Sequence, residues 1–299
     1  MTLPMPENPP PAVAAAPPPR CNVLRSAYAL YTFTLRQHRH GKRWLIMAGL
    51  MLLPALLAIL TRATESGVFG RVLEFDLAFM FIPQGLLPLL ALVYASGILH
   101  DEQEQQTITY LLLRPVSRPL LYVVKLLAAM TAAVVLALAS TILTYAAIYA
   151  GQIHQADAPL RCLQACLIDG LAVATYCCIF GLLGLLTRRV LIAGIIYIAL
   201  VEGLLANLPF AIRLITVIYY TRLIAYRTLP FVVPGAFGST RNIAAEAWHF
   251  HISGDPTLSH DPHTWVCVAV LLGGGALCTA AAALLCRNRE FYVKTPDKT

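Results

Sequence analysis

Six long apolar segments dominate this sequence and limit what the chain can fold into. Each approaches or exceeds the roughly 20 residues that an α-helix needs to cross the hydrocarbon core of a bilayer. They cover residues 44–60, 77–99, 120–150, 163–186, 190–208 and 264–286. Such runs are too long for strands, so they predict an all-α integral membrane protein with six transmembrane helices. The first is short and contains Pro54, which a membrane helix tolerates when its neighbours satisfy the freed carbonyl group.

The composition favours the same class of protein. Hydrophobic residues make up 58% of the 299-residue chain and charged residues 12%, whereas a soluble domain carries about 25% charged residues. A soluble fold would leave too much apolar surface uncovered, and collagen, a wholly disordered chain and a disulfide-stapled secreted domain are excluded as well. Most of the eight Cys lie in or beside apolar runs, which is typical of small buried side chains rather than of disulfides or a metal site.

The basic residues predict the orientation of the spans. With the N-terminus inside, 15 of the 22 Lys and Arg residues fall on the inner side, and the short outer loops carry three. The inner ones are Arg20, Arg25, Arg36, Arg39, Lys42, Arg43, Arg114, Arg118, Lys125, Arg188, Arg189, Arg287, Arg289, Lys294 and Lys298. By the positive-inside rule, both termini are cytoplasmic and the protein is a multi-pass protein of the cell membrane. The net charge of +7 then needs no nucleic-acid partner, since no basic stripe carries interleaved stacking aromatics.

The segment before the first span has two parts. Residues 1–20 are a Pro-rich tail without the apolar core of a signal peptide, and we expect them to be disordered. Residues 21–43 place Leu24, Tyr28 and Tyr31 on one helix face and end in a basic cluster. This pattern predicts an amphipathic helix in the membrane interface, in contact with lipid; the alternative is a cytosolic helix packed on a partner. The transmembrane domain is then 44–286, and 287–299 is a cytoplasmic tail.

The outer loop 209–263 is the largest polar segment on its side of the membrane. Its part 212–229 is apolar enough for a seventh span, but Arg213, Arg222 and Arg227 would each cost about 2.5–3.5 kcal/mol near a helix centre. We therefore expect one or two short helices at the outer surface. The loop also contains the potential metal ligands His249, His251, His260, His263, Asp255 and Asp261. Such residues can bind a transition metal, but in a polar loop they are usually solvated, and we predict no metal site.

The cytoplasmic loop 100–119 is the most informative segment. Asp101, Glu102 and Glu104 place negative charge at the start of a short helix, where it complements the helix dipole. Apolar residues at 108, 111 and 112 give this helix one hydrophobic face, and Arg114-Pro115 ends it. Ser117 is placed to cap the span that follows. A short helix with charged ends and an exposed apolar face suits docking in a groove on a partner protein.

This loop resembles the first cytoplasmic loop of ABC-2 type transporter permeases. The matching residues are Glu102 or Glu104, Thr107, Leu111 to Arg114, Pro115, Ser117, Arg118, Leu121, Tyr122 and Lys125. The stretch 201–209 resembles the end of the fifth span in one branch of the family. The usual Gly before Thr107 is Gln106 here, so the start of the loop helix differs from the family pattern. The resemblance implies an export cycle by alternating access, a homodimer or a heterodimer with a related permease, and a partner ATPase that docks at Glu102, Glu104, Thr107, Arg114, Pro115, Ser117 and Arg118.

The nucleotide site is expected on that partner. The phosphate-binding motif G-x-x-x-x-G-K-[ST] does not occur, since Gly41-Lys42 is preceded five residues earlier by Arg36. We therefore expect no enzymatic activity and no cofactor in this chain, with ATP bound and hydrolysed by the partner subunit.

Two carboxylates lie inside predicted spans, where they are unfavourable unless they find a donor or face water. Glu202, with Asn207, is a candidate for the transport pathway, facing the dimer axis; the alternative is a hydrogen-bonded residue that fixes helix packing. Asp169, near the outer end of its span, is expected to be structural or interfacial.

Two other functions remain open from the sequence. A secondary, ion-coupled transporter could use Glu202 and Asp169, although such proteins usually contain internal repeats, which we do not find. The second open function is that of a membrane anchor or assembly protein without transport activity.

Overall fold

The computed structural model describes residues 23–40, 42–64, 70–104, 118–150, 157–187, 189–208, 211–234, 240–248 and 262–288. The α-helices are α1 (Val23–His40), α2 (Lys42–Thr64), α3 (Gly70–Glu74), α4 (Leu87–Glu104), α6 (Arg118–Tyr149), α7 (Ala158–Leu186), α8 (Val190–Tyr197), α9 (Val217–Thr228), α10 (Ile243–Ala247) and α11 (Thr264–Asn288). The π-helical segments are η1 (Phe75–Leu86) and η2 (Ile198–Leu204), and the 3₁₀ turns are η3 (Leu205–Asn207) and η4 (Ala211–Ile215). The strands are β1 (Val232–Pro234) and β2 (Thr240–Asn242).

The prediction of six helical spans is confirmed. Within the described part of the chain, the helices long and apolar enough to cross a membrane are Arg43–Thr64, Gly70–Gly97, Pro119–Tyr149, Ala158–Leu186, Val190–Asn207 and Thr264–Arg287. The second and fourth begin earlier than the apolar pattern indicated. The reason is that Glu74 and Arg161, in the first turns of these spans, are buried against each other and do not end the helices.

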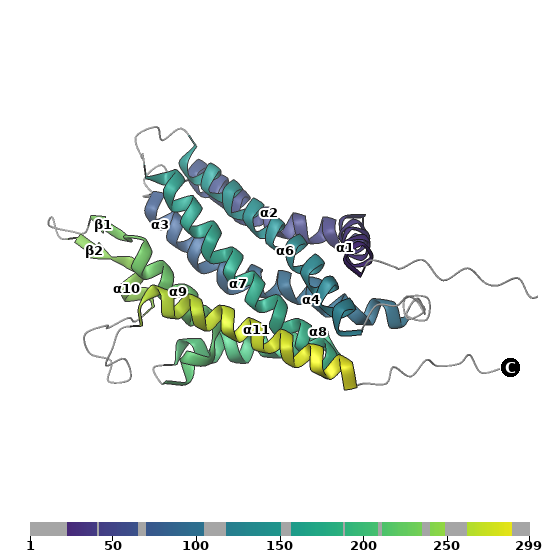
Figure 1. The fold of residues 1–299 in the computed structure, drawn as a ribbon. Coiled ribbons are helices and arrows are strands. Elements are labelled where there is room, and N and C mark those ends of the chain that lie inside the picture. Colours follow the sequence, from purple (N-terminus) through teal and green to yellow (C-terminus); the bar gives the residue numbers. More distant parts are fainter. Residues whose placement is uncertain are drawn as a thin grey trace, which may run out of the picture.

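The central helix of the bundle is α7. It packs against α4 and α6, and against α11 and α9. In Figure 1, α2 and α6 form the upper edge of the bundle, α7 runs through the middle and α11 forms the lower edge. Leu90, Tyr176 and Phe180 are among the residues fully buried between these helices, while α11 leaves large apolar side chains such as Leu277 exposed. A bundle with an apolar exterior fits a hydrocarbon surrounding.

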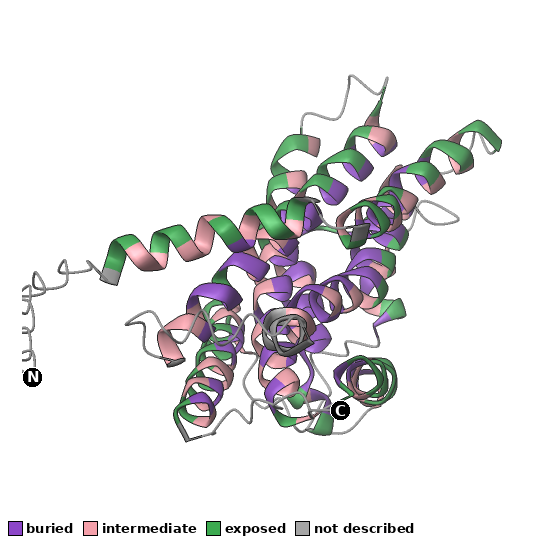
Figure 2. Cartoon of the chain, turned by 90° about the vertical axis from the view of Figure 1, so that its right-hand side faces the viewer, coloured by how far each residue is buried: buried purple, intermediate pink, exposed green. Residues whose placement is uncertain are grey.

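The amphipathic segment before the first span is helical, as predicted. Helix α1 packs on α6 through a hydrogen bond from the Tyr31 hydroxyl to Thr131 Oγ1 (3.0 Å). Figures 1 and 2 together show that it crosses the end of the bundle and extends away from it. Leu24, Tyr28 and Phe33 are 86%, 70% and 68% exposed. This exposed apolar surface supports a position in the membrane interface, which stays a prediction.

The end opposite α1, which we call the hairpin end, carries the antiparallel pair β1–β2. The pair is anchored by aromatic contacts: the Phe231 ring lies 5.0 Å from that of Phe79 and 5.4 Å from that of Phe75. Trp248 packs on Phe75 as well, at 5.0 Å between ring centroids. This aromatic group joins the hairpin end to the main hydrophobic core of the bundle.

One expectation about this end is wrong. The segment 212–229 forms two short helical elements, η4 and α9, as predicted, but α9 does not lie at the surface. It packs against α7, α11 and η1, and its residues from Val217 to Ala225 are buried apart from Tyr220. Two of the arginines that argued for a surface position, Arg213 and Arg222, have an aromatic and a polar partner inside the protein, which the linear sequence does not reveal.

A close approach of two helices occurs at Gly194. A Cβ atom at this position of α8 would lie 2.2 Å from Leu92 Cδ1 and 3.0 Å from Leu92 Cγ, on α4. Leu92 is 2% exposed, so its side chain has little space to move aside. Glycine is therefore required at this contact.

We expect Gly194→Ala to destabilise the purified protein by about 1–3 kcal/mol, because overpacking forces side chains and backbone apart. Thermal unfolding in detergent measures the effect. Gly49→Ala is the matched control, since a Cβ there meets no atom within 4 Å. Adding Leu92→Ala to Gly194→Ala should restore part of the loss; equal stabilities of the two glycine variants would refute the close contact.

Candidate functional site at the hairpin end of the bundle

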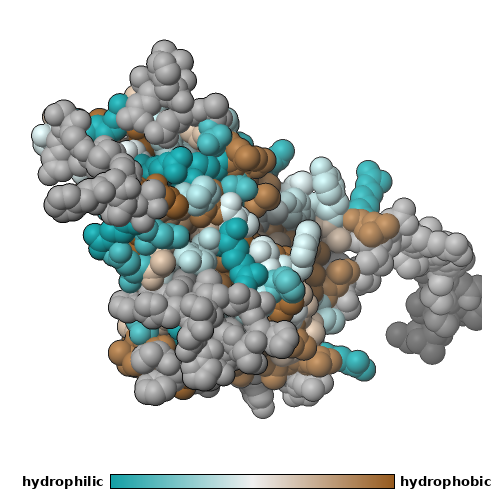
Figure 3. Space-filling model, turned by 90° about the vertical axis from the view of Figure 1, so that its left-hand side faces the viewer, coloured by the Kyte–Doolittle hydropathy of each residue, from teal (hydrophilic) through white to brown (hydrophobic). Residues whose placement is uncertain are grey.

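Buried polar groups concentrate at the hairpin end. Figure 3 looks onto this end and shows hydrophilic residues gathered between hydrophobic surfaces. Two carboxylates inside the protein, Glu74 and Glu202, are 0% and 1% exposed. Ionised groups with so little access to water need donors within the protein.

Glu202 finds its donors at the N-terminus of α9. Its Oε1 accepts a hydrogen bond from the backbone N–H of Val217 (3.1 Å), and its Oε2 accepts one from Ile218 (3.0 Å). The hydroxyl of Tyr197 donates to Oε1 over 3.2 Å. The first N–H groups of a helix have no partner within the helix, and the helix dipole favours a negative charge beside them. Glu202 therefore caps α9 across an interface between two segments.

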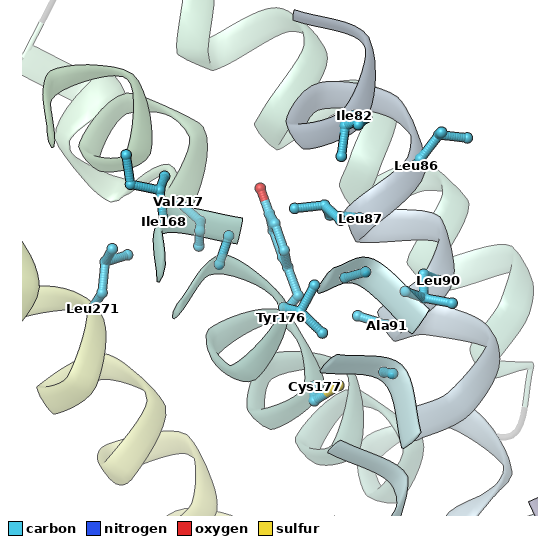
Figure 4. Packing of buried hydrophobic residues seen from close by; sticks show 14 of the residues in the cluster. Ile82, Leu86, Leu87, Leu90, Ala91, Ile168, Tyr176, Cys177, Val217 and Leu271 are labelled. Atoms are coloured by element: carbon cyan, nitrogen blue, oxygen red, sulfur yellow. The ribbon is translucent and has the colours of Figure 1, made fainter. Parts of the chain in front are cut away.

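The local sequence prepares this arrangement. Thr216 is the N-cap of α9, and its Oγ1 accepts a hydrogen bond from Tyr219 N (3.3 Å). The π-helical segment η2 carries Glu202 into the same region. Figure 4 shows Val217 beside Tyr176 and Ile168 of α7, within the apolar core. The cap is thus formed where α9 enters the core, away from solvent.

A second contact joins the same two segments. The Arg222 guanidinium, on α9, donates from Nη1 to Asn207 Oδ1 (3.0 Å), and Asn207 Nδ2 donates to Gly203 O (2.6 Å). Burial lowers the pKa of Arg222 to about 10, so the guanidinium stays charged at neutral pH. Arg213 lies 5.1 Å from the centre of the Tyr219 ring, a cation–π distance. These contacts allow basic residues to lie inside the bundle.

Glu74 is the centre of a separate buried cluster. The hydroxyls of Tyr145 and Tyr149 donate to its two carboxylate oxygens over 2.7 and 2.6 Å, and Arg161 Nε donates to both over 2.9 and 3.1 Å. Arg161 Nη1 also donates to Pro230 O (3.0 Å), and its guanidinium lies 5.5 Å from the Phe231 ring centre. The cluster joins α3, α6 and α7 to the segment that leads into β1.

Asp169 occupies a third polar position, deeper in α7. It is 1% exposed, and its Oδ2 accepts a hydrogen bond from Thr141 Oγ1 (2.6 Å) across the contact with α6. Its Oδ1 has no hydrogen-bond partner among the described residues. The position supports the structural role that the sequence suggested.

Comparison with known families decides the class of this protein. Residues 34–206, more than half of the chain, match the family described as ABC-2 family transporter protein. The chain belongs to the ABC-2 transporter family. A comparison with curated proteins finds no match. The protein is therefore a multi-pass ABC-2 transporter permease, the membrane component of an ABC transporter, a class that is generally not catalytic.

The positions expected for ATPase coupling in this ABC-2 permease lie only partly within the described residues. Glu102 and Glu104 belong to the last turn of α4, so the prediction that these acidic residues begin a separate helix is wrong: the apolar span continues through them as one helix. Arg118 is the first residue of α6. Thr107, Arg114, Pro115 and Ser117 lie outside the described residues. His249, His251, His260, Asp255 and Asp261 of the histidine-rich loop lie outside them too.

The geometry distinguishes the two roles considered for Glu202. Its carboxylate points into the protomer and is engaged by two backbone N–H groups and a hydroxyl. Asn207 is exposed but is held by its bond with Arg222. This favours the packing role, in which Glu202 positions α9, and a direct role of either residue in transport stays a prediction.

Sequence reasoning missed Glu74, Tyr145 and Tyr149, and it treated Arg161 only as a charge in a short outer loop. No motif connects residues separated by more than 70 positions in the chain. One signal was available: Glu74 and Arg161 both lie next to apolar segments on the same predicted side of the membrane. Opposite charges at adjacent span ends can form an ion pair.

We expect Glu202→Leu to destabilise the ABC-2 permease strongly, because it leaves two buried N–H groups without an acceptor, each at about 1–3 kcal/mol. Glu202→Gln retains one carbonyl acceptor and should assemble with a smaller loss. Thermal unfolding measures both, with the exposed Glu246→Leu as control. Normal stability of Glu202→Leu would exclude the capping role; normal stability with defective transport in Glu202→Gln would instead support a role in the pathway.

A double-mutant cycle tests the Glu74 cluster. Arg161→Met leaves the buried Glu74 carboxylate without its cation, and we expect a loss of about 3–5 kcal/mol. Glu74→Gln combined with Arg161→Met should be less destabilised than Arg161→Met alone, since no unpaired charge remains. Thermal unfolding of the singles and the double gives the coupling energy. Strictly additive losses would contradict the ion pair.

Proposed function

We propose that this permease is the membrane-spanning subunit of an exporter, driven by a separate ATPase that docks on the cytoplasmic loop 101–119. The observation that carries the proposal is the charged, conformationally restricted sequence of this loop, which resembles the coupling loop of the family. Its flanking residues Glu104 and Arg118 end α4 and begin α6. The proposal includes function as a homodimer or heterodimer in the plasma membrane with cytoplasmic termini, and ATP bound by the partner.

The positions of the helix ends that flank the loop support the proposal. Figure 1 shows the end of α4 and the beginning of α6 on the same side of the bundle as α1 and the C-terminus, opposite the β1–β2 hairpin. Both helices pack directly on the central helix α7. A partner bound between their ends could therefore transmit a movement into the middle of the bundle through two rigid elements.

We expect the double charge reversal Glu104→Lys/Arg118→Glu to abolish co-purification of the ATPase while leaving membrane insertion unchanged. Removing one partner of a buried interfacial charge pair costs about 2–5 kcal/mol, which weakens a complex at least about 30-fold. The test co-expresses the permease with an ABC ATPase encoded beside its gene and measures the recovered ratio of the two subunits.

The matched control is Arg241→Glu/Glu246→Lys. These two residues form an exposed ion pair at the hairpin end, so the control carries the same charge changes far from the loop. Undiminished co-purification of the loop variant would refute the docking site. If the unaltered permease recovers no ATPase, the result favours the alternatives: a secondary transporter or a membrane anchor.

A further inference from the structure

A stripe of residues that are not buried runs along the π-helical segment η1, inside the second span. Seven of its twelve residues are buried. The residues that are not buried are Asp76, Met80, Phe81, Gln84 and Gly85. A π-helix bonds residue i to i+5, so side chains four or five positions apart lie on the same face. The five residues therefore form one narrow face, which we call the η1 stripe.

Hydrogen bonds to the Met80 sulfur hold the side chains of Met80 and Gln84, both on the stripe, in place. Gln84 Nε2 donates to Met80 Sδ over 2.8 Å, and Trp248 Nε1 donates to the same sulfur over 3.1 Å. Gln84 lies near the middle of the span Gly70–Gly97. The stripe is thus ordered and extends from the hairpin end to the centre of the bundle.

The charged member of the stripe has a different environment. Asp76 is exposed, and it forms no hydrogen bond or ion pair with any residue that the structure describes. The two buried carboxylates of the same end, Glu74 and Glu202, are each held by several donors. An ionised carboxylate that has no hydrogen-bond donor in the protein is strongly unfavourable in contact with lipid hydrocarbon. In contact with water it is stable, because water supplies the donors.

Exposed residues in the middle of two other spans are aliphatic. Leu277 on α11 and Ile195 on α8 are 73% and 58% exposed and are aliphatic. On the η1 stripe, by contrast, an acid and an amide accompany a thioether and the 37% exposed ring of Phe81. Carboxylates attract cations. Aromatic faces and thioethers make favourable contacts with the apolar groups that such a cation carries.

We propose that the η1 stripe lines a water-filled part of the transport pathway and accepts cations that carry apolar groups, with Asp76 supplying the charge attraction and Phe81 the apolar contact. The inference deepens the proposed function, since a transport pathway presupposes a transporter. A partner protomer or lipid on the stripe is the competing occupant, and either would keep water-soluble reagents away.

Cysteine labelling tests the proposal without knowledge of the natural substrate. Gln84→Cys and Phe81→Cys are treated in membrane vesicles with two membrane-impermeant methanethiosulfonates, one cationic (trimethylammonium) and one anionic (sulfonate). The unaltered chain gives the background from its own cysteines. Leu277→Cys is the matched control, because Leu277 is exposed near the middle of the span Thr264–Arg287.

We expect both stripe variants to react, with a ratio of cationic to anionic labelling rates about tenfold above the ratio measured for a small neutral thiol in solution. Adding Asp76→Asn should lower this ratio to the solution value while the cysteines stay reactive. Tetraphenylphosphonium, a cation with four aromatic rings, should slow labelling when Asp76 is present and not in Asp76→Asn. Gln84→Cys removes the hydrogen bond to Met80 and could disturb the local structure. Phe81 makes none of the hydrogen bonds described above, so labelling of Phe81→Cys controls for this disturbance.

Three results would overturn the inference. Reaction at both stripe positions no faster than at Leu277→Cys would place the stripe against lipid or a second protomer. A rate ratio no higher than that of the free thiol in solution would exclude a role of Asp76 in attracting cations, and absence of protection by tetraphenylphosphonium would exclude this ligand class. The measurements need no ATPase, so their outcome is independent of whether loop 101–119 docks one.

Discussion

A helix that begins inside a protein needs acceptors for its first backbone N–H groups, and the hairpin end depends on how α9 meets this requirement. Glu202 supplies both of its oxygens to Val217 and Ile218. A buried helix start without such a partner would be strongly unfavourable in surroundings that contain no water. Because the cap is satisfied, α9 can fill the space between α7, α11 and η1, and the bundle is closed at this end.

The second polar cluster extends the same principle. Glu74 and Arg161 neutralise each other, and Tyr145 and Tyr149 complete the hydrogen bonding of the carboxylate. Arg161 also binds Pro230 O, so the ion pair anchors the chain where it enters the β1–β2 hairpin. Groups that would destabilise the bundle individually thus stabilise it collectively, because the two charges neutralise each other and Nε and Nη1 of Arg161 both have acceptors within hydrogen-bond distance.

The two ends of this ABC-2 permease consequently differ in character. The hairpin end is held by the buried ion pair of Glu74 and Arg161, by helix caps and by aromatic packing, whereas the α1 end exposes Leu24, Tyr28 and Phe33 on a helix that crosses the bundle. The central helix α7 contacts both α4 and α6, which flank the proposed docking loop, and also contacts α9. A movement at the loop would therefore meet a rigid structure at the far end, with η1 and its exposed stripe between them.

The class of fold and the number of spans follow from the amino-acid sequence alone, because an apolar run of about 20 residues has one stable arrangement in a bilayer. The sequence also indicated the family through the loop around Glu102 and Arg118, where charge, turn residues and spacing are local in the chain. Tertiary structure alone decided the partners of the buried charges. Glu202 and Val217, or Glu74 and Arg161, meet only after the helices have packed, and their distance along the chain carries no sign of the contact. The burial of α9 was misjudged for the same reason: the cost of an arginine inside the bundle depends on a partner such as Asn207, and only the folded chain brings the two together.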